Sequence, residues 1–280
     1  MGAFPEIAMR LAILADIHGN LPAFEAALEH VAAQRVDRIV IVGDIVVGAP
    51  DSGSCWRLAQ SLGCPILRGN HERYLFHFDT PHAPPLWKTE RFGPVRWALT
   101  QCTEAERQCM ADLPPFLQLP EAEGVFFAHA SARSDNDTIV AYTPDSEIAA
   151  MFPDVTEPYI VRGHNHIAQV RLWEGRMIVT TGSVGLPLDG IATAQYLLLE
   201  RHREGWKVQH QSVSYDVDAT VRRFSETGYL EAGGPLARLF LREVATAGSQ
   251  IVPFFRAYDR WQAETSLTLS EAVERFLSVF

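Results

Sequence analysis

Five short segments of the chain contain residue types that bind divalent metal ions. They are Asp16-Ile17-His18, Gly43-Asp44, Gly69-Asn70-His71-Glu72, Ala128-His129-Ala130 and Gly163-His164-Asn165-His166. Glycines beside these residues let the backbone approach a bound ion or phosphate closely. The two aspartates, one asparagine and four of the histidines exceed what one tetrahedral zinc ion requires. A mixed imidazole and carboxylate set of this size suits two divalent ions that share a bridging carboxylate.

The spacing within two of these segments suggests that their ligands act together. Asp16 and His18, like His164 and His166, are two residues apart, and extended backbone points such residues to the same side. Two metal ions roughly 3.5–4 Å apart form the clamp that promotes in-line displacement at phosphorus, because they activate water and neutralise charge on the phosphoryl oxygens. The pattern therefore predicts hydrolysis of phosphate esters.

Taken one at a time, the same residues have ordinary explanations. An aspartate at the end of a strand commonly caps the following helix, which would suit Asp16 or Asp44. We interpret five further histidines as surface or hydrogen-bonded residues: His30, His77, His82, His202 and His210. It is the joint occurrence of seven ligand-competent residues in five glycine-flanked segments that favours a metal site.

The segments follow runs of residues that are typical of β-strands. The predicted order is strand 8–15, helix 20–31, strand 38–42, helix 52–62 and strand 64–67, then strands 124–128 and 159–162. Alternating strands and helices predict a parallel α/β unit. Because ligands bind at the carboxyl ends of parallel strands, these elements would bring the five segments to one edge of a sheet.

The remaining chain completes the predicted architecture. Residues 79–88 are Pro-rich and predict a loop or lid, and two antiparallel hairpins are predicted within 170–181 and 194–211. The tail lacks strand patterns and favours three or four helices. We predict a metal-binding domain over 1–215 and a helical C-terminal extension over 216–280 that packs on the same domain.

Composition excludes other classes of function. The 280 residues include 24 basic and 34 acidic side chains, a formal net charge of −10. Binding to extended nucleic acid or to an anionic membrane relies on clustered lysines and arginines, so we expect neither partner. The four cysteines form no CxxC pair and no disulfide framework, which favours a reduced, cytoplasmic protein.

In this order the segments DxH, GD, GNH, H and GHxH resemble the motifs of the calcineurin-like metallophosphoesterase superfamily, over residues 9 to 212. The resemblance implies that two ions share a bridging Asp44. The other implied ligands are Asp16, His18 and His166 for the first ion, and Asn70, His129 and His164 for the second. His71 matches the family's general acid or leaving-group stabiliser. The implied fold is α/β (α+β), a two-sheet β-sandwich flanked by helices, here with a helical tail.

Two positions depart from part of that superfamily. Protein Ser/Thr phosphatases and the related dinucleoside-tetraphosphatases continue GD with an Arg-Gly that binds substrate phosphate, whereas this chain has Val47 and Gly48 there. Loss of a guanidinium that forks onto phosphate is not conservative. Protein phosphatases also carry an aspartate there that pairs with the GNH histidine, and this chain lacks it. The segment 43–52 is more similar to the small bacterial phosphodiesterase branch.

We therefore expect a dimetal-dependent phosphoesterase in which a metal-bridging hydroxide attacks a phosphodiester, or alternatively a monoester, in line. One alternative is a protein Ser/Thr or dinucleoside-polyphosphate phosphatase. Another is a non-catalytic scaffold of the same fold with the helical tail as its partner-binding face. Manganese is the expected metal, and iron, nickel, cobalt and zinc are alternatives because all tolerate this ligand mixture.

The sequence also offers candidates for substrate contact. Arg68, Arg133 and Arg162 lie beside ligand positions and are our candidates for binding the substrate phosphate, although each also suits a solvated or ion-paired arginine. The expected substrate is a small phosphate ester or a nucleotide. A homodimer through the C-terminal helices remains an open alternative.

Overall fold

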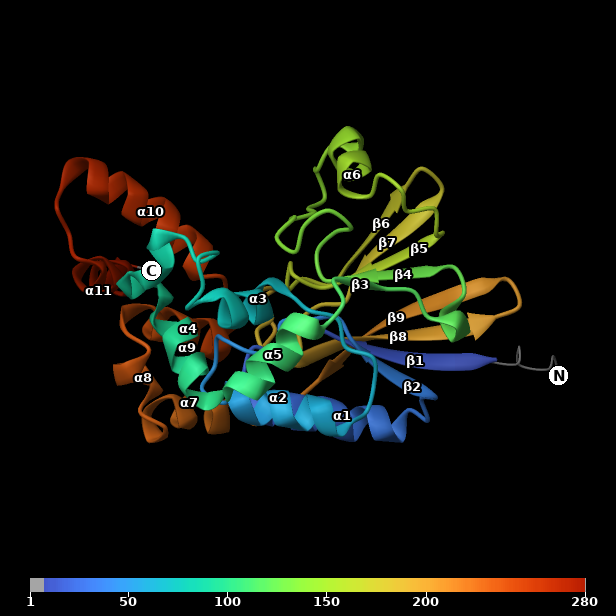
Figure 1. Ribbon diagram of the computed structural model, residues 1–280, viewed down its shortest axis with the longest axis horizontal. Helices are drawn as coiled ribbons and strands as arrows, with labels where there is room; N and C mark the ends of the chain where they lie inside the picture. The colour runs from blue at the N-terminus through green and yellow to red at the C-terminus, as the bar shows by residue number, and fades with distance from the viewer. Residues whose placement is uncertain (1–7, 280) are drawn as a thin grey trace.

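The computed structural model describes residues 8–279, in which two β-sheets lie face to face with helices outside them (Figure 1). The four-stranded sheet has the order β2-β1-β8-β9 and the five-stranded sheet the order β3-β4-β5-β7-β6. Each sheet is mixed, because β1 and β2 are parallel, as are β4, β5 and β7, while the other pairs are antiparallel. The predicted two-sheet sandwich with flanking helices is confirmed.

The elements have the following bounds. The four-stranded sheet contains β1 (Met9–Leu14), β2 (Arg38–Ile41), β8 (Ala194–His202) and β9 (Gly205–Val213). The five-stranded sheet contains β3 (Phe116–Leu117), β4 (Val125–Ala128), β5 (Tyr159–Arg162), β6 (Gln169–Trp173) and β7 (Arg176–Thr180). The α-helices before residue 216 are α1 (Leu21–Ala33), α2 (Ser52–Ser61), α3 (Asn70–His77), α4 (Gly93–Gln101), α5 (Glu104–Asp112) and α6 (Asp145–Met151). Those after it are α7 (Val217–Glu226), α8 (Tyr229–Ala232), α9 (Pro235–Thr246), α10 (Ile251–Glu264) and α11 (Leu269–Val279).

The apolar run of β1 is explained by burial on both faces of its sheet. Leu11 and Ile13 point toward the other sheet and belong to one buried cluster with Phe127 of β4. Ala12 and Leu14 point the other way and pack in the cluster that contains the helices. A strand covered on both sides is continuously apolar rather than alternating.

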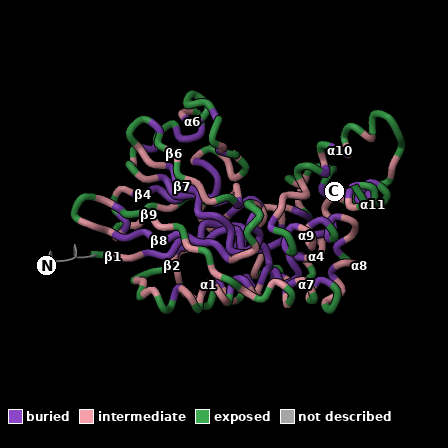
Figure 2. The backbone as a smooth tube through the Cα atoms, turned by 180° about the vertical axis from the view of Figure 1, so that it is seen from behind, coloured by how far each residue is buried: buried purple, intermediate pink, exposed green. Residues whose placement is uncertain are grey.

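Helices cover the outer face of each sheet. Phe24 of α1 and Trp56 of α2 are buried in the cluster on the outer side of the four-stranded sheet. Ile148 of α6 packs with Phe126 and Trp173 on the outer side of the five-stranded sheet. Figure 2 shows many buried residues in the two sheets, so the sandwich contains a large part of the buried interior of the molecule.

Two sequence predictions differ from the structure in detail. Residues 64–67 do not form a full strand, because only an isolated bridge between Ile41 and Ile66 joins them to β2. The tail, as far as it is described (216–279), contains five helices instead of three or four, since the short α8 is set off by Gly228 and Gly233 at its two ends. Among the described residues, no helix is both long and apolar enough to span a membrane.

The C-terminal helices are hydrogen-bonded to the elements that precede them. Thr220 of α7 donates to the Asn20 side chain at 2.8 Å, and Arg223 pairs with Asp51. The Tyr229 hydroxyl donates to the Gly48 carbonyl oxygen at 2.9 Å. The division into 1–215 and 216–280 stays a prediction, and its residues 1–7 and 280 lie outside the described part of the chain.

A buried glutamate joins α9 to α10. The Glu243 carboxylate accepts the backbone N–H groups of Gln250 at 2.7 Å and Ile251 at 3.0 Å. Burial raises the pKa of Glu243 from 4.5 to about 7, although these two hydrogen bonds oppose the shift. The carboxylate therefore gives up its proton at a higher pH in the folded protein than in the unfolded chain.

We predict that Glu243→Gln makes the stability of the protein less dependent on pH. Between pH 4.5 and about 7 the unfolded chain has released this proton while the folded protein still holds it, so raising the pH destabilises the fold. The shift corresponds to about 3 kcal/mol of unfolding free energy. Urea denaturation at several pH values measures the free energy of unfolding. Between pH 4.5 and about 7 this free energy should fall less for Glu243→Gln than for wild type. Glu264→Gln, an exposed change at the other end of α10, should match wild type. If the unfolding free energy had the same pH dependence in all three proteins, the raised pKa of Glu243 would be contradicted.

Candidate metal centre

The seven predicted ligands converge at the end of the sandwich where β1, β2, β4 and β5 finish. Six of the seven side chains are buried and His164 is half-buried. Two groups of potential ligand atoms, each within 4.8 Å of one another, contain six of them: Asp16, His18, Asp44 and His166 in one, and Asp44, His129 and His164 in the other. Asp44 belongs to both groups, as a bridging ligand must.

The first group surrounds a point between two imidazole rings. The Nε2 atoms of His18 and His166 are 2.9 Å apart. The Asp16 carboxylate lies 3.6 Å from the nearer His166 nitrogen, and the Asp44 carboxylate lies 3.7 Å from His18 Nε2. Four donor atoms of mixed imidazole and carboxylate type therefore face one another, an arrangement that fits a divalent cation.

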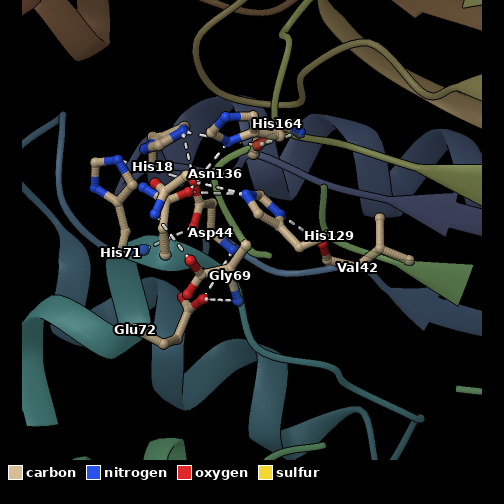
Figure 3. A network of polar contacts seen from close by, with 12 residues as sticks. His18, Val42, Asp44, Gly69, His71, Glu72, His129, Asn136 and His164 are labelled. Carbon is tan, nitrogen blue, oxygen red and sulfur yellow. Dashed lines mark hydrogen bonds and ion pairs between the residues drawn. The ribbon is translucent and has the colours of Figure 1, made fainter. Parts of the chain in front are cut away.

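The second group contains the predicted asparagine. His129 Nε2 lies 3.2 Å from the Asp44 carboxylate and 3.1 Å from the Asn70 side-chain oxygen. The same Asn70 oxygen is 3.1 Å from His164 Nδ1. Figure 3 shows Asp44 between His71 on one side and His129 on the other. Asn70 thus completes a second set of donors around the shared carboxylate.

Backbone carbonyl groups fix the orientation of three of the histidine rings. The Nδ1 atom of His18 is 2.7 Å from the Val47 oxygen, that of His166 is 2.7 Å from the Leu186 oxygen, and that of His129 is 2.9 Å from the Val42 oxygen. A carbonyl oxygen only accepts, so in each ring Nδ1 carries the hydrogen. In His18 and His166 the Nε2 atom is left to bind a cation, as outer hydrogen bonds of metal-ligating histidines commonly arrange, whereas Nε2 of His129 faces Asp44 and Asn70.

The backbone at the paired ligands is not extended, which corrects our interpretation of the two-residue spacing. Asp16 and His18 have φ values of 55° and 51°, and His164 and His166 have 69° and 59°. These values lie in the left-handed region, which L-residues rarely occupy. The side chains of each pair still converge, but tight turns direct them and not strand alternation. Strain of this kind tends to gather at functional sites.

Two glycines permit the carboxylates to sit where they do. A Cβ atom at Gly69 would lie 2.1 Å from Asp44 Oδ1, and a Cβ at Gly163 would lie 2.8 Å from Asp16 Oδ2. Neither distance is sterically possible. The glycines before Asn70 and His164 are therefore required by the close approach of neighbouring loops.

Glu72 holds the backbone around Asp44, a role that sequence analysis missed. This fully buried carboxylate accepts the N–H of Ile45 at 2.7 Å, that of Gly69 at 2.7 Å and that of Asp44 at 2.9 Å (Figure 3). It therefore ties the loop after β2 to the first turn of α3, which carries Asn70. The available clue was its place three residues after Gly69, the spacing of a helix capping box.

The electrostatics of the site leave several imidazoles free to act as ligands. Burial lowers the pKa of His166 to about 4 and that of His164 to about 2, and it holds the pKa of His18 well below its usual value. These rings are neutral at pH 7 and keep a lone pair. Neutral imidazole is the form that binds metal ions.

The two carboxylates of the site, Asp16 and Asp44, are both fully buried, and their pKa values shift in opposite directions. Burial raises the pKa of Asp16 to about 8, and the negative charge of Asp44 adds to the shift while His129 opposes it. Burial would also raise the pKa of Asp44, but the charge and hydrogen bond of His129 outweigh it and hold the value well below normal. Burial likewise opposes protonation of His129, yet the charge of Asp44 raises the pKa of His129 to about 9, so a cation bound here would displace that proton. Bound cations would relieve the cost of placing two carboxylates together away from water. The donor set and its charges therefore fit divalent metal ions.

His71 lies at the edge of this cluster. Its Nε2 atom is 3.8 Å from the Asp44 carboxylate, and its ring meets that of His18 edge-on with centroids 4.7 Å apart. Burial lowers the pKa of His71, and the negative charge of Asp44 only partly offsets this. The ring is therefore neutral at pH 7 and can donate one N–H to a bound group.

The three candidate arginines are not equivalent. Arg162 is fully buried and donates to the Ala130 oxygen, the Asp137 oxygen and the Asn165 side chain, each at 2.6 Å. This placement argues against substrate contact, and Arg162 instead joins the loops that follow β4 and β5. Arg68 and Arg133, together with Arg73, line a cavity of about 380 Å³ beside His129. Arg133 forms a bidentate pair with Asp137, and Arg73 forms one with Asp135.

Val47 has a backbone role at the position where part of the superfamily places arginine. Its φ of 65° is left-handed, and its carbonyl oxygen is the acceptor for His18 Nδ1. The side chain is 2% exposed. This position thus orients a candidate metal ligand, His18, and offers no cation to a substrate.

Comparison with known proteins identifies relatives over most of the chain. The profile of the "Calcineurin-like phosphoesterase superfamily domain" matches residues 9–204. The uncharacterized protein MJ0912 of Methanocaldococcus jannaschii is 25% identical over 255 residues, which are 82% of this chain and 97% of that protein. A symmetrical bis(5'-nucleosyl)-tetraphosphatase of Chromohalobacter salexigens is 34% identical over 85 residues, which are 29% of this chain and 31% of that enzyme.

A solved structure has the same arrangement of elements. The metallophosphoesterase from Sphaerobacter thermophilus superposes with a TM-score of 0.67 at 25% identity, over 85% of this chain and 99% of that one. The helical region after residue 216 extends beyond the part of the chain that the family profile matches.

We predict that Glu72→Gln weakens divalent metal binding by about 10–100-fold, the range for changes to groups that orient metal ligands. An amide presents one accepting oxygen and one donating NH₂, so it cannot accept all three N–H groups. Calorimetric titration of the metal-free protein with Mn²⁺ measures the change. Glu106→Gln is a matched control, because Glu106 accepts the Thr103 N–H at 2.7 Å in the capping box of α5, away from the site. Equal affinity for Glu72→Gln and wild type would show that Glu72 does not position the ligands.

Proposed function

Because the chain belongs to the calcineurin-like phosphoesterase superfamily, we propose that it is a phosphodiesterase that depends on two divalent metal ions. The observation that supports this proposal most directly is that Asp44 belongs to both groups of potential ligands. A shared carboxylate between two complete donor sets suits a two-metal centre better than a single structural ion. Retention of all seven ligands also argues against a non-catalytic scaffold.

The residues of the site would divide the reaction between them. Asp16, His18 and His166 would hold one cation, and Asn70, His129 and His164 the other, with Asp44 between them. Two divalent ions at these positions would activate a water molecule and neutralise charge on the phosphoryl oxygens. Manganese is the ion that we propose, and the same donors accept iron, nickel, cobalt or zinc.

His71 would act on the leaving group. Its neutral ring lies at the rim of the cluster and has an unpartnered, buried Nδ1 atom. We propose that an N–H of this ring donates to the ester oxygen as the bond to phosphorus breaks. A hydrogen bond that strengthens as negative charge develops stabilises the transition state more than the bound substrate.

A diester is favoured over a phosphoprotein because Val47 replaces the arginine that protein phosphatases use. A dinucleoside polyphosphate is the second candidate. It is favoured by the 85-residue similarity to a tetraphosphatase and by the arginines that line the cavity beside His129. Faster turnover of diadenosine tetraphosphate than of simple diesters would promote this candidate.

We predict that the Mn²⁺-loaded protein hydrolyses bis-p-nitrophenyl phosphate faster than p-nitrophenyl phosphate. Asp44→Asn should lower the rate by more than about 100-fold, because a neutral amide bridges two cations far more weakly than the carboxylate that both ions would share. The rate of p-nitrophenolate release measures the hydrolysis of each substrate by wild type and by the variant. Asp145→Asn, at an exposed aspartate on α6, should retain wild-type activity. Absence of metal-dependent turnover would refute the enzymatic function, and a preference for the monoester would refute diester specificity alone.

We predict that His71→Asn affects poor leaving groups most. With methyl phenyl phosphate, kcat should fall by about 100-fold, at the lower end of the usual range for proton-transfer groups. With methyl p-nitrophenyl phosphate the loss should be about 10-fold, since p-nitrophenolate needs less stabilisation. His77→Asn, six residues later on α3, serves as the control and should match wild type. Equal losses on both substrates would assign His71 to binding or folding and not to the leaving group.

A further inference from the structure

A large groove opens directly on the candidate metal centre. Its volume is about 750 Å³, within the roughly 300–1,000 Å³ typical of small-molecule sites. One end is formed by His18, His71, His164 and His166, which belong to or adjoin the metal cluster. The groove therefore continues from the point where phosphorus would be attacked toward the space that the rest of the ester must occupy.

The far walls of the groove are apolar and come from segments distant in sequence. Leu86 and Phe92 precede α4, Leu236 and Phe240 lie on α9, and Val252 and Phe255 lie on α10. The α9 and α10 residues follow the last residue that the family profile matches, residue 204. The extension thus contributes one side of the groove, from residues outside the part of the chain that the family profile matches.

The C-terminal wall is anchored against the body of the molecule. The Arg91 guanidinium lies over the rings of Phe255 and Tyr258, at 5.0 and 5.2 Å from their centroids. The Gly190 N–H donates to the Ala247 oxygen at 2.8 Å, which joins the end of α9 to the loop before β8. These contacts join α10 to the segment before α4 and the end of α9 to the loop before β8.

The charged groups of the groove do not suit a second phosphate. Arg91 is the one lysine or arginine among the described residues that line it, and it is engaged by two aromatic rings and by Asp259 at 3.9 Å. Glu243 is committed to the backbone at the start of α10. The surface that remains for a ligand is mostly aliphatic and aromatic, with Phe92, Phe240 and Phe255 among its members.

We propose that this groove binds the organic group of the substrate, and that this group is uncharged, bulky and largely apolar, such as an aromatic ring system. The proposal rests on the proposed phosphodiesterase function and narrows its substrate class. The phosphodiester binds at the metal cluster, and the apolar group lies between α9, α10 and the segment before α4. Burial of its apolar surface supplies the affinity, and the metal centre supplies the reaction.

The test compares diesters that share one leaving group. The three substrates are methyl p-nitrophenyl phosphate, phenyl p-nitrophenyl phosphate and thymidine 5'-(p-nitrophenyl phosphate). The value of kcat/KM is measured for each with the Mn²⁺-loaded full-length protein. The phenyl ester should exceed the methyl ester by about 10–100-fold, mainly through KM, because a ring is removed from water on binding. A ratio near one would overturn the proposal, as would a thymidine ester that is preferred over the phenyl ester.

Substitutions on the two walls separate binding from intrinsic reactivity. Val252 on α10 is 53% exposed and Leu86 is 47% exposed, so an aspartate at either position is compatible with folding. Val252→Asp and Leu86→Asp should each lower the phenyl-to-methyl ratio by at least about 5-fold, since a charge in the groove opposes burial of a ring. Val279→Asp, at a 67% exposed position on α11 outside the groove, should retain the wild-type ratio. An unchanged ratio in both groove variants would overturn the proposal.

Failure of the groove can be distinguished from failure of the proposed function. Turnover of the methyl ester without a preference for the phenyl ester contradicts only the proposal for the groove. The absence of metal-dependent turnover of any ester contradicts the proposed phosphodiesterase function. A binding measurement then tests independently whether the groove binds an apolar group. Calorimetric titration of the Mn²⁺-loaded protein should give phenylphosphonate an affinity about 10-fold or more above methylphosphonate, and equal affinities would overturn the proposal.

Discussion

The structure is organised around two carboxylates, Asp16 and Asp44, that are buried together where strands of both sheets end. Neither could remain there without compensation, because a charge removed from water needs partners of opposite charge or several hydrogen bonds. His164 and His71 donate backbone N–H groups to them, and His129 lies against Asp44. The loops, the glycines that allow their approach and the buried Glu72 all serve this one arrangement.

Much of the fold and the composition of the site could be predicted from the sequence. The strand ends were visible because an apolar run such as that of β1 stops at a polar residue, and topology then brings such ends together. The positions of Asp16, His18 and Asp44 followed from that rule. Their left-handed backbone did not, because a tight turn and an extended segment can place the same residue types two apart.

The residues that the sequence concealed are those whose role depends on long-range contacts. Glu72 resembles an ordinary helix-capping residue until its hydrogen bonds to Asp44 and Ile45 are seen. Arg162 resembles a phosphate ligand until its guanidinium is found bonded to loop carbonyl groups. The groove is a stronger example, since its walls come from segments before α4 and from α9 and α10, and no local pattern relates them.

The left-handed φ angles at five of the seven ligand positions also set a limit on how stable this protein can become. Each costs roughly 1–2 kcal/mol relative to a relaxed backbone. Glycine or asparagine would remove much of that cost at Asp16, His18, Asp44, His164 or His166, but would also remove or alter a metal donor. A sequence optimised only for thermal resistance would therefore lose candidate metal donors at these positions. The trade-off between stability and the proposed metal binding is concentrated in the backbone of the site itself.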